Sequence, residues 1–203
     1  WDSIVRNVGM DRLVSEVKDC GLVALVNWSS LRHGTEIWRY FGCEVMPRAC
    51  GAGDGEPRRN IYFDITDMTK HSRAAILECL DIIMSYKAFG KVTLGLNENE
   101  ALLLYQAIAQ DVPAELKSVV QTIHAQGMAD VVLVHPIHGC YVADENGVRF
   151  IDGSFIENPL VTTGGGDHFN AGYGYAVLQG MEIDAAVKFA LKVASSFVAS
   201  GHL

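Results

Sequence analysis

The sequence predicts an α/β fold in which helices cover both faces of a mostly parallel sheet, forming a three-layer αβα sandwich. Short apolar runs alternate with longer amphipathic segments, a rhythm typical of a parallel sheet with crossover helices. The rhythm changes after residue 134, where Asn146-Gly147 separates two short strand-like runs. Because Asn-Gly between such runs is a strong hairpin signal, we expect an antiparallel hairpin near the C-terminal side of the sheet.

Each expected element follows from its own pattern. Runs of branched and aromatic residues predict the strands, and apolar residues spaced by three and four predict the helices. The glycine-rich, charged stretch at 51–60 is predicted to be a loop. The expected strands are 22–26, 61–65, 91–96 and 131–134; the hairpin strands are 141–143 and 148–151; the expected helices are 35–41, 72–89, 98–110, 113–126, 166–179 and 183–200.

The composition bounds the class of protein. A chain of 203 residues, 49% hydrophobic and 20% charged, is ordinary for one globular domain, which we place at 1–203. A net charge of −8 without a basic cluster argues against nucleic acid and membrane partners. Five cysteines without a CxxC pair predict reduced thiols and a cytoplasmic location. Because the chain starts at Trp1 and stops directly after a helical pattern, we expect it to be truncated at both ends.

The most informative segment is Gly164-Gly165-Gly166-Asp167, which opens an expected helix. Glycines at a helix start leave the first amides unobstructed, and these amides with the helix dipole form an anion site that suits a phosphoryl group. Asp167 falls in the first turn, where it can accept a proton from an attacking hydroxyl. The alternative interpretation is an ordinary glycine-rich loop with an acidic residue at the helix start.

Two common phosphate-binding motifs are excluded. The chain has no GxxxxGK[ST], and Phe169 stands where GxGxxG would require its third glycine after Gly164 and Gly166. The hypothesis that the chain is a nicotinamide-dependent oxidoreductase therefore loses its main support.

The stretch 162–172 resembles the C-terminal signature DTTGAGDxFxAG of the ribokinase (PfkB) family of carbohydrate kinases. The segment Asn97-Glu98-Asn99-Glu100 follows an expected strand and is similar to the family's NxxE motif, although the same residues would cap any helix. The motifs occur in the family's order, and the resemblance extends over about 23–200. It implies a ribokinase-like fold and phosphoryl transfer from ATP, with Mg²⁺, to a small-molecule sugar or sugar-like substrate.

The resemblance also implies roles for individual residues: a base, an anion hole, a pair acting on magnesium and phosphates through water, and nucleotide contacts. One further residue, at the end of the first strand, is a candidate substrate contact or simply a strand-ending Asn. By this resemblance, Asp167 would be the base and also bind substrate, and the anion hole would consist of Gly164, Gly165 and Gly166 with the Asp167 amide. The magnesium pair would be Asn97 and Glu100, and the nucleotide contacts Gly139, Thr163 and Asn170. The residue at the end of the first strand is Asn27.

Several positions depart from the family pattern. Val134 and Pro136 replace a phosphate-contacting Thr and the first Gly of the turn before Gly139. Candidate substitute donors are His135 and His138. Val161 replaces the Asp that opens the signature, so potassium activation is not expected.

Three alternative functions remain open beside a sugar kinase. The acceptor could be a nucleoside or a pyridoxal-type molecule, because fold does not settle acceptor identity. The departures at Val134, Pro136 and Val161 would also fit a catalytically degenerate, nucleotide-binding regulatory protein, against which the retained Asp167 argues. The third alternative is the oxidoreductase that Phe169 disfavours. Dimers are common in the family, so a homodimer is the assembly to test for.

Overall fold

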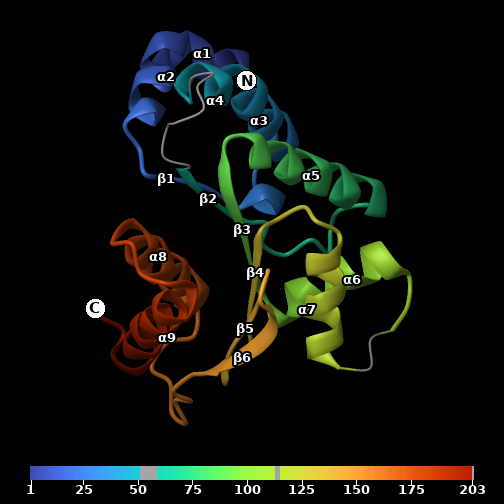
Figure 1. Cartoon of the computed structure of the whole chain (residues 1–203), viewed down its shortest axis with the longest axis vertical. Coiled ribbons are helices and arrows are strands. Elements are labelled where there is room, and N and C mark those ends of the chain that lie inside the picture. Colours follow the sequence, from blue (N-terminus) through green and yellow to red (C-terminus); the bar gives the residue numbers. More distant parts are fainter. Residues whose placement is uncertain (51–58, 113–114, 203) are drawn as a thin grey trace.

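The chain forms a six-stranded sheet between two layers of helices (Figure 1). In the computed structural model, which describes residues 1–50, 59–112 and 115–202, the strands lie side by side in sequence order. They are β1 (Leu22–Val26), β2 (Arg59–Asp64), β3 (Gly90–Asn97), β4 (Val131–His135), β5 (Gly139–Asp144) and β6 (Gly147–Asp152). The first four are parallel and the last two add as an antiparallel hairpin, so the predicted sheet is confirmed.

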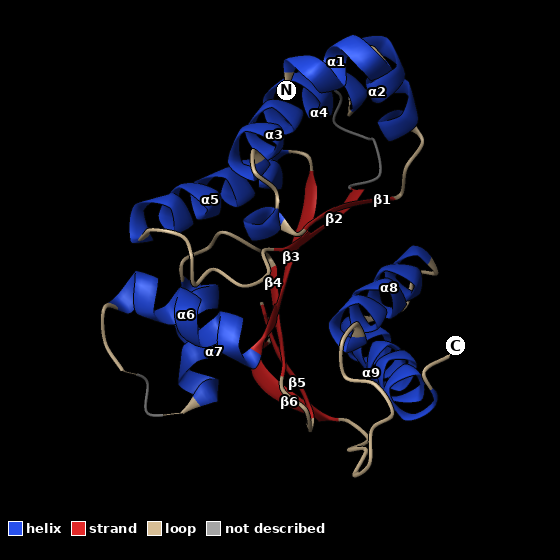
Figure 2. Ribbon diagram, turned by 180° about the vertical axis from the view of Figure 1, so that it is seen from behind, coloured by secondary structure: helices blue, strands red, loops and turns tan. Residues whose placement is uncertain are grey.

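The helices divide between the two faces of the sheet (Figure 2). On one face lie α8 (Gly165–Leu178) and α9 (Ile183–Ser200); on the other lie α3 (Gly34–Tyr40), α5 (Arg73–Ser85), α6 (Glu98–Ala109) and α7 (Leu116–Ala125). The short helices α1 (Asp2–Val8), α2 (Met10–Lys18) and α4 (Met46–Ala49) gather at the β1 end. In the described part of the chain, no helix has the length and apolar character needed to cross a bilayer.

Strand β2 contributes to both hydrophobic cores. Ile61 and Phe63 pack into the core on the α5 side, whereas Tyr62 belongs to the core beneath α8 and α9. Because successive side chains of a strand alternate between faces, Asp64 leaves the sheet on the same side as Tyr62. A polar side chain at the end of β2 thus lies on the face that α8 covers.

Some expected boundaries are wrong. The helix expected at 72–89 ends as an α-helix at Ser85 and continues as a 3-10 turn to Ala88. The helix expected at 35–41 runs into a π-helical turn at Phe41–Val45 before α4. Pro47, in the first turn of α4, has no N–H to donate to the preceding turn, which disfavours a continuous α-helix there.

The expected loop at 51–60 is wrong for its last two residues. Arg59 and Asn60 begin β2, and the Arg59 guanidinium donates to the backbone oxygens of Cys20 and Ala49. The remainder of that loop, 51–58, and the first two residues of the helix expected at 113–126 lie outside the described residues. The helices α1 and α2 were not expected at all.

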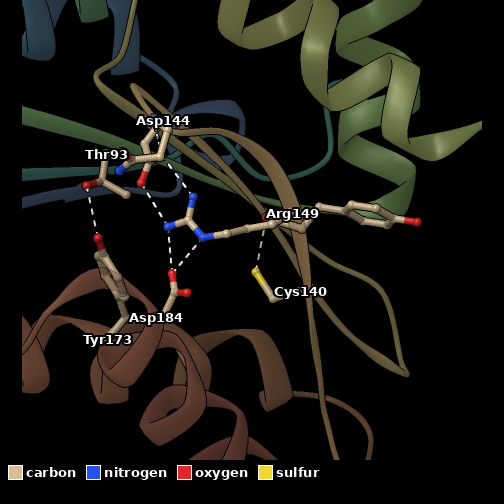
Figure 3. A network of polar contacts seen from close by, with 8 residues as sticks. Thr93, Cys140, Asp144, Arg149, Tyr173 and Asp184 are labelled. Carbon is tan, nitrogen blue, oxygen red and sulfur yellow. Dashed lines mark hydrogen bonds and ion pairs between the residues drawn. The ribbon is translucent and has the colours of Figure 1, made fainter.

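Arg149 lies at the centre of a polar network that ties the hairpin to α9 (Figure 3). Its guanidinium donates to both carboxylate oxygens of Asp144, at 2.9 Å each, and to Asp184 in the first turn of α9 at 2.6 and 2.8 Å. Asp144 is only 4% exposed, and the hydrogen bonds from Arg149 hold the pKa of its carboxyl below the usual range. Beside it, the hydroxyls of Thr93 and Tyr173 lie 3.4 Å apart and link the sheet to α8.

Replacing Arg149 by Ala should lower the free energy of unfolding by about 2–3 kcal/mol, because it leaves the Asp144 carboxylate buried without its partner. Urea unfolding followed by circular dichroism measures this loss. The matched variant Asp184→Asn removes a half-exposed carboxylate from the same network and should cost less than about 1 kcal/mol. Equal losses in the two variants would contradict the structural role given to the Asp144 pair.

Candidate active site

The carboxyl ends of the four parallel strands meet at one edge of the sheet. Val26 is level with Asp64 across the β1–β2 pair, and Asn97 is level with His135 across the β3–β4 pair. The start of α8 reaches the same edge, since a Cβ added at Gly166 would lie 3.6 Å from His135 Cε1. Crevices at this edge are where α/β sheets usually bind ligands.

The glycine run sets the first turn of α8. Gly164 has a φ of 91°, a left-handed conformation that glycine adopts without strain, and the helix begins at Gly165. His168 holds this turn from behind: Nδ1 donates to the Gly164 carbonyl at 2.7 Å, and its ring stacks on Phe197 at 3.5 Å. Asp167 is exposed in the first turn and lines a pocket of about 450 Å³ between β1 and α8.

Among the described residues, no backbone acceptor is found for the N–H groups of Gly166 and Asp167, whereas the Gly165 N–H reaches the Thr162 carbonyl at 3.3 Å. Free amides at the positive end of a helix suit an anion. Of the expected anion hole, Gly166 and Asp167 therefore retain the donors best placed for a ligand.

Asn170, one turn further along α8, joins the helix to β2. The Tyr62 hydroxyl donates to Asn170 Oδ1 at 2.5 Å, and Asn170 Nδ2 donates to Asp64 Oδ2 at 2.5 Å. Burial raises the pKa of the Tyr62 hydroxyl well above its usual range, so this group keeps its proton and donates. Asn170 was expected to contact the nucleotide, but its oxygen and one N–H are directed at protein groups.

Asp64 was not among the expected site positions, yet it ends β2 at the same edge of the sheet and contacts Asn170. Burial is the main cause of its raised pKa; the hydrogen bonds from Thr66 and Asn170 oppose that rise, and the negative charge of Asp167 adds to it. Asp64 accepts from Asn170, which lies one turn from Asp167 on α8, so both carboxylates belong to this edge of the sheet. One available sequence signal was the alternation of β2 from Tyr62 to Asp64, which ends beneath a glycine-led helix.

Asn97 and Glu100 form a capping box at the start of α6. Glu100 accepts from the Asn97 backbone N–H at 2.9 Å and from its side-chain amide at 2.7 Å, while Asn97 Oδ1 accepts from the Glu100 N–H at 2.9 Å. The capping alternative is thus realised. Both residues also line a pocket of about 500 Å³ with Asp67 and Thr69, so capping and ligand binding are compatible.

Glu100 is only 8% exposed. Burial first, and then the nearby charges of Asp64 and Asp67, raise the pKa of its carboxyl to about 7 against the opposing effect of the hydrogen bond from the Asn97 N–H. Two acidic side chains therefore act on Glu100 at this edge, and no Lys or Arg of the described chain forms an ion pair with it.

This unbalanced negative charge fits the magnesium ion that the resemblance implies. Asn97 and Glu100 offer the oxygen atoms that Mg²⁺ prefers. The described residues contain no group of three His, Cys, Asp or Glu side chains placed to enclose a metal. Two such side chains would suit an ion that keeps several waters and is shared with substrate phosphates, as Mg²⁺ commonly is.

The remaining expected positions lie less directly at the site. Gly139 begins β5, where a Cβ would meet the Ile151 carbonyl oxygen at 2.3 Å, and its N–H donates to the Pro136 carbonyl at 3.2 Å, so packing already accounts for this glycine. Thr163 is exposed in the turn before α8. Asn27 is exposed directly after β1 with a left-handed φ of 62°, typical of an Asn that ends a strand.

The raised pKa of Glu100 predicts a pH-dependent effect of Glu100→Gln on stability. Below about pH 4.5 the carboxyl is protonated whether the chain is folded or unfolded, whereas between about pH 4.5 and 7 only the folded chain keeps the proton. Raising the pH through this window therefore destabilises the parent but not the neutral variant.

From pH 5 to 8, the unfolding free energy of the variant should rise relative to that of the parent by on the order of 2–3 kcal/mol. Urea unfolding at both pH values measures the difference. A difference that does not change with pH would contradict the raised pKa.

Comparison with known proteins supports one family. A family profile described as prokaryotic ketohexokinase matches residues 1–202. The chain is 23% identical over 204 residues to a ketohexokinase of Haloferax volcanii, an alignment that covers 99% of this chain and 52% of that protein. It is 34% identical over 80 residues to a ribokinase of Bacillus subtilis, covering 36% of this chain and 27% of that protein. The chain thus spans about half the length of the relative that it matches throughout.

Solved structures share the fold at low sequence identity. An adenosine kinase from Sinorhizobium meliloti aligns with a TM-score of 0.69 and 16% identity over 94% of this chain and 52% of the other. A ribokinase from Thermotoga maritima aligns with a TM-score of 0.66 and 16% identity over 92% and 52%. The expected ribokinase-like fold is therefore confirmed, and the chain belongs to the prokaryotic ketohexokinase family of PfkB-type carbohydrate kinases.

Proposed function

We propose that this protein is an ATP-dependent kinase that phosphorylates a primary hydroxyl of a sugar or sugar-derived molecule, with Asp167 as the general base. One observation carries the proposal: an exposed Asp167 lies in the first turn of a 14-residue helix, beside N–H groups of Gly166 and Asp167 that have no backbone acceptor within the described parts of the chain. A base and an anion site on one rigid element are what phosphoryl transfer to an alcohol requires.

The residues divide the chemistry between two helices. Asp167 would take the proton from the acceptor hydroxyl as its oxygen attacks the γ-phosphorus, while the amides at the start of α8 stabilise charge on the transferred group. Asn97 and Glu100 at the start of α6 would hold Mg²⁺ through water, and the bound ion would neutralise charge on the nucleotide phosphates. ATP would thus lie along the edge of the sheet between these helix starts.

A ketohexose is the acceptor class that we propose to test first. The support is the description of the family profile that matches residues 1–202, together with the Haloferax volcanii ketohexokinase. Purified protein with ATP and Mg²⁺ should release ADP in the presence of a ketohexose and less with aldoses, nucleosides or pyridoxal. ADP release with a nucleoside or pyridoxal alone would reassign the acceptor. ATP binding without turnover on any acceptor would favour the regulatory alternative.

Replacing Asp167 by Asn should lower the rate of acceptor-dependent ADP release by about 10²–10⁴-fold, because the amide cannot take the hydroxyl proton. The fold should be kept, since the side chain is exposed. The matched variant Asp11→Asn, on the exposed surface of α2, should leave the rate unchanged. Activity of Asp167→Asn within about tenfold of the parent would exclude Asp167 as the base.

A further inference from the structure

A series of side-chain hydrogen bonds, called the relay below, connects α8 with β2 one turn away from Asp167. The Tyr62 hydroxyl donates to Asn170 Oδ1, and Asn170 Nδ2 donates to Asp64 Oδ2, each at 2.5 Å. The other oxygen of Asp64 accepts from the Thr66 N–H at 3.0 Å, which fixes the carboxylate at the strand end.

The donors and acceptors in this series allow the Asn170 side-chain amide only one orientation. An ionised carboxylate only accepts hydrogen bonds, so Asn170 must present its NH₂ group to Asp64 and its carbonyl oxygen to Tyr62. Tyr62 is 2% exposed and keeps its proton, so its hydroxyl satisfies that oxygen. A side-chain amide held at both ends by groups of one strand cannot turn without breaking a buried hydrogen bond.

Gly95 on the neighbouring strand β3 makes room for the contact. A Cβ at this position would lie 1.8 Å from the Tyr62 hydroxyl oxygen and 2.6 Å from Cζ of the same ring. Nothing else about Gly95 requires glycine, since its φ is not positive. The missing side chain on β3 thus lets the phenol reach Asn170.

The position of Asn170 on α8 connects this contact to the candidate base. Residues three apart lie on nearly the same face of a helix, so fixing Asn170 fixes the rotation of the helix at Asp167. A side-chain carboxylate lies roughly 6 Å from the helix axis, so a rotation of about 10° would move it by roughly 1 Å. A displacement of that size can cost about 10²-fold in rate.

We propose that Tyr62, Asn170 and Asp64 are positioning residues that set the rotation of α8 and thereby direct Asp167 toward the acceptor hydroxyl. The proposal rests on the function proposed above for Asp167. It gives Asn170 a positioning role in place of the expected nucleotide contact. Loss of these hydrogen bonds should lower kcat, since proton transfer depends on the position of the base. It should change KM for ATP much less, because the backbone amides lie closer to the helix axis than the carboxylate and move less when the helix rotates.

Two variants break the relay in different ways. Tyr62→Phe removes only the hydroxyl, and Gly95→Ala displaces the phenol while keeping every polar group of the relay. Both should lower kcat by about 10-fold to 100-fold with KM for ATP within about twofold of the parent. Tyr173→Phe is the matched control, because it removes a buried hydroxyl of the same core that contacts Thr93 (Figure 3) and should keep kcat within about twofold. Equal kcat in Tyr62→Phe and Tyr173→Phe would overturn the relay.

A double-mutant cycle separates the relay from the function on which it rests. If Tyr62 acts through Asp167, adding Tyr62→Phe to Asp167→Asn should cause no further loss of rate. If the rate loss of the double variant instead equals the product of the losses of the two single variants, the positioning role is overturned. An unchanged rate in Asp167→Asn alone would instead overturn the base assignment, an outcome that is read independently of Tyr62.

Amide hydrogen exchange gives a readout that does not require turnover. Exchange at His168 and Phe169, in the first turns of α8, should be faster in Tyr62→Phe and Gly95→Ala than in Tyr173→Phe, because only the first two release Asn170. Identical protection of these amides in Tyr62→Phe and Tyr173→Phe would overturn the relay whether or not an acceptor has been found.

Discussion

The parallel register of β1 to β4 is the constraint on which the site depends. Parallel strands end at the same edge of a sheet, so pairing Val26 with Asp64 and Asn97 with His135 gathers the polar strand ends that sequence alone leaves far apart. The antiparallel hairpin β5–β6 brings the chain back to this edge, and the chain then crosses to the face where α8 and α9 pack. Two side chains of β2 bind Asn170 near the glycine-led start of α8.

The same edge concentrates negative charge at a cost in stability. Asp64 and Glu100 both have a raised pKa, chiefly through burial, and each also responds to a neighbouring carboxylate. Groups of this kind cluster at functional sites, where a ligand or ion compensates for them. By contrast, the other buried carboxylate, Asp144, is fully paired with Arg149, and its pKa is lowered. The two places therefore differ in their electrostatics: the buried carboxylate Asp144 beside the hairpin has a cationic partner, whereas Glu100 at the strand-end edge has a raised pKa.

Local patterns predicted the parts of the structure that local forces decide. The buried runs of β3 and β4, the Asn146-Gly147 turn and the glycines before Asp167 each carry their own signal, and the structure follows them. The extension of β2 to Arg59 depends on contacts with the distant backbone oxygens of Cys20 and Ala49, which no short window contains. Asn170 shows why the site could be predicted only in part from the sequence. Its position in the motif suggested a ligand contact, but its hydrogen-bond partner Asp64 lies 106 residues earlier in the chain. The structural reason for a glycine at position 95 is visible only in the fold, where the Tyr62 ring lies beside it.

The proposed function requires that the start of α8 bind the phosphates of ATP. Titration of ¹⁵N-labelled protein with a non-hydrolysable ATP analogue and Mg²⁺, followed by amide chemical shifts, tests this binding without requiring an acceptor. The amides of Gly166 and Asp167 should shift most, followed by those at the start of α6, since these groups line the two sides of the proposed phosphate path. Shifts confined to other parts of the chain, with the α8 amides unchanged at saturation, would contradict it.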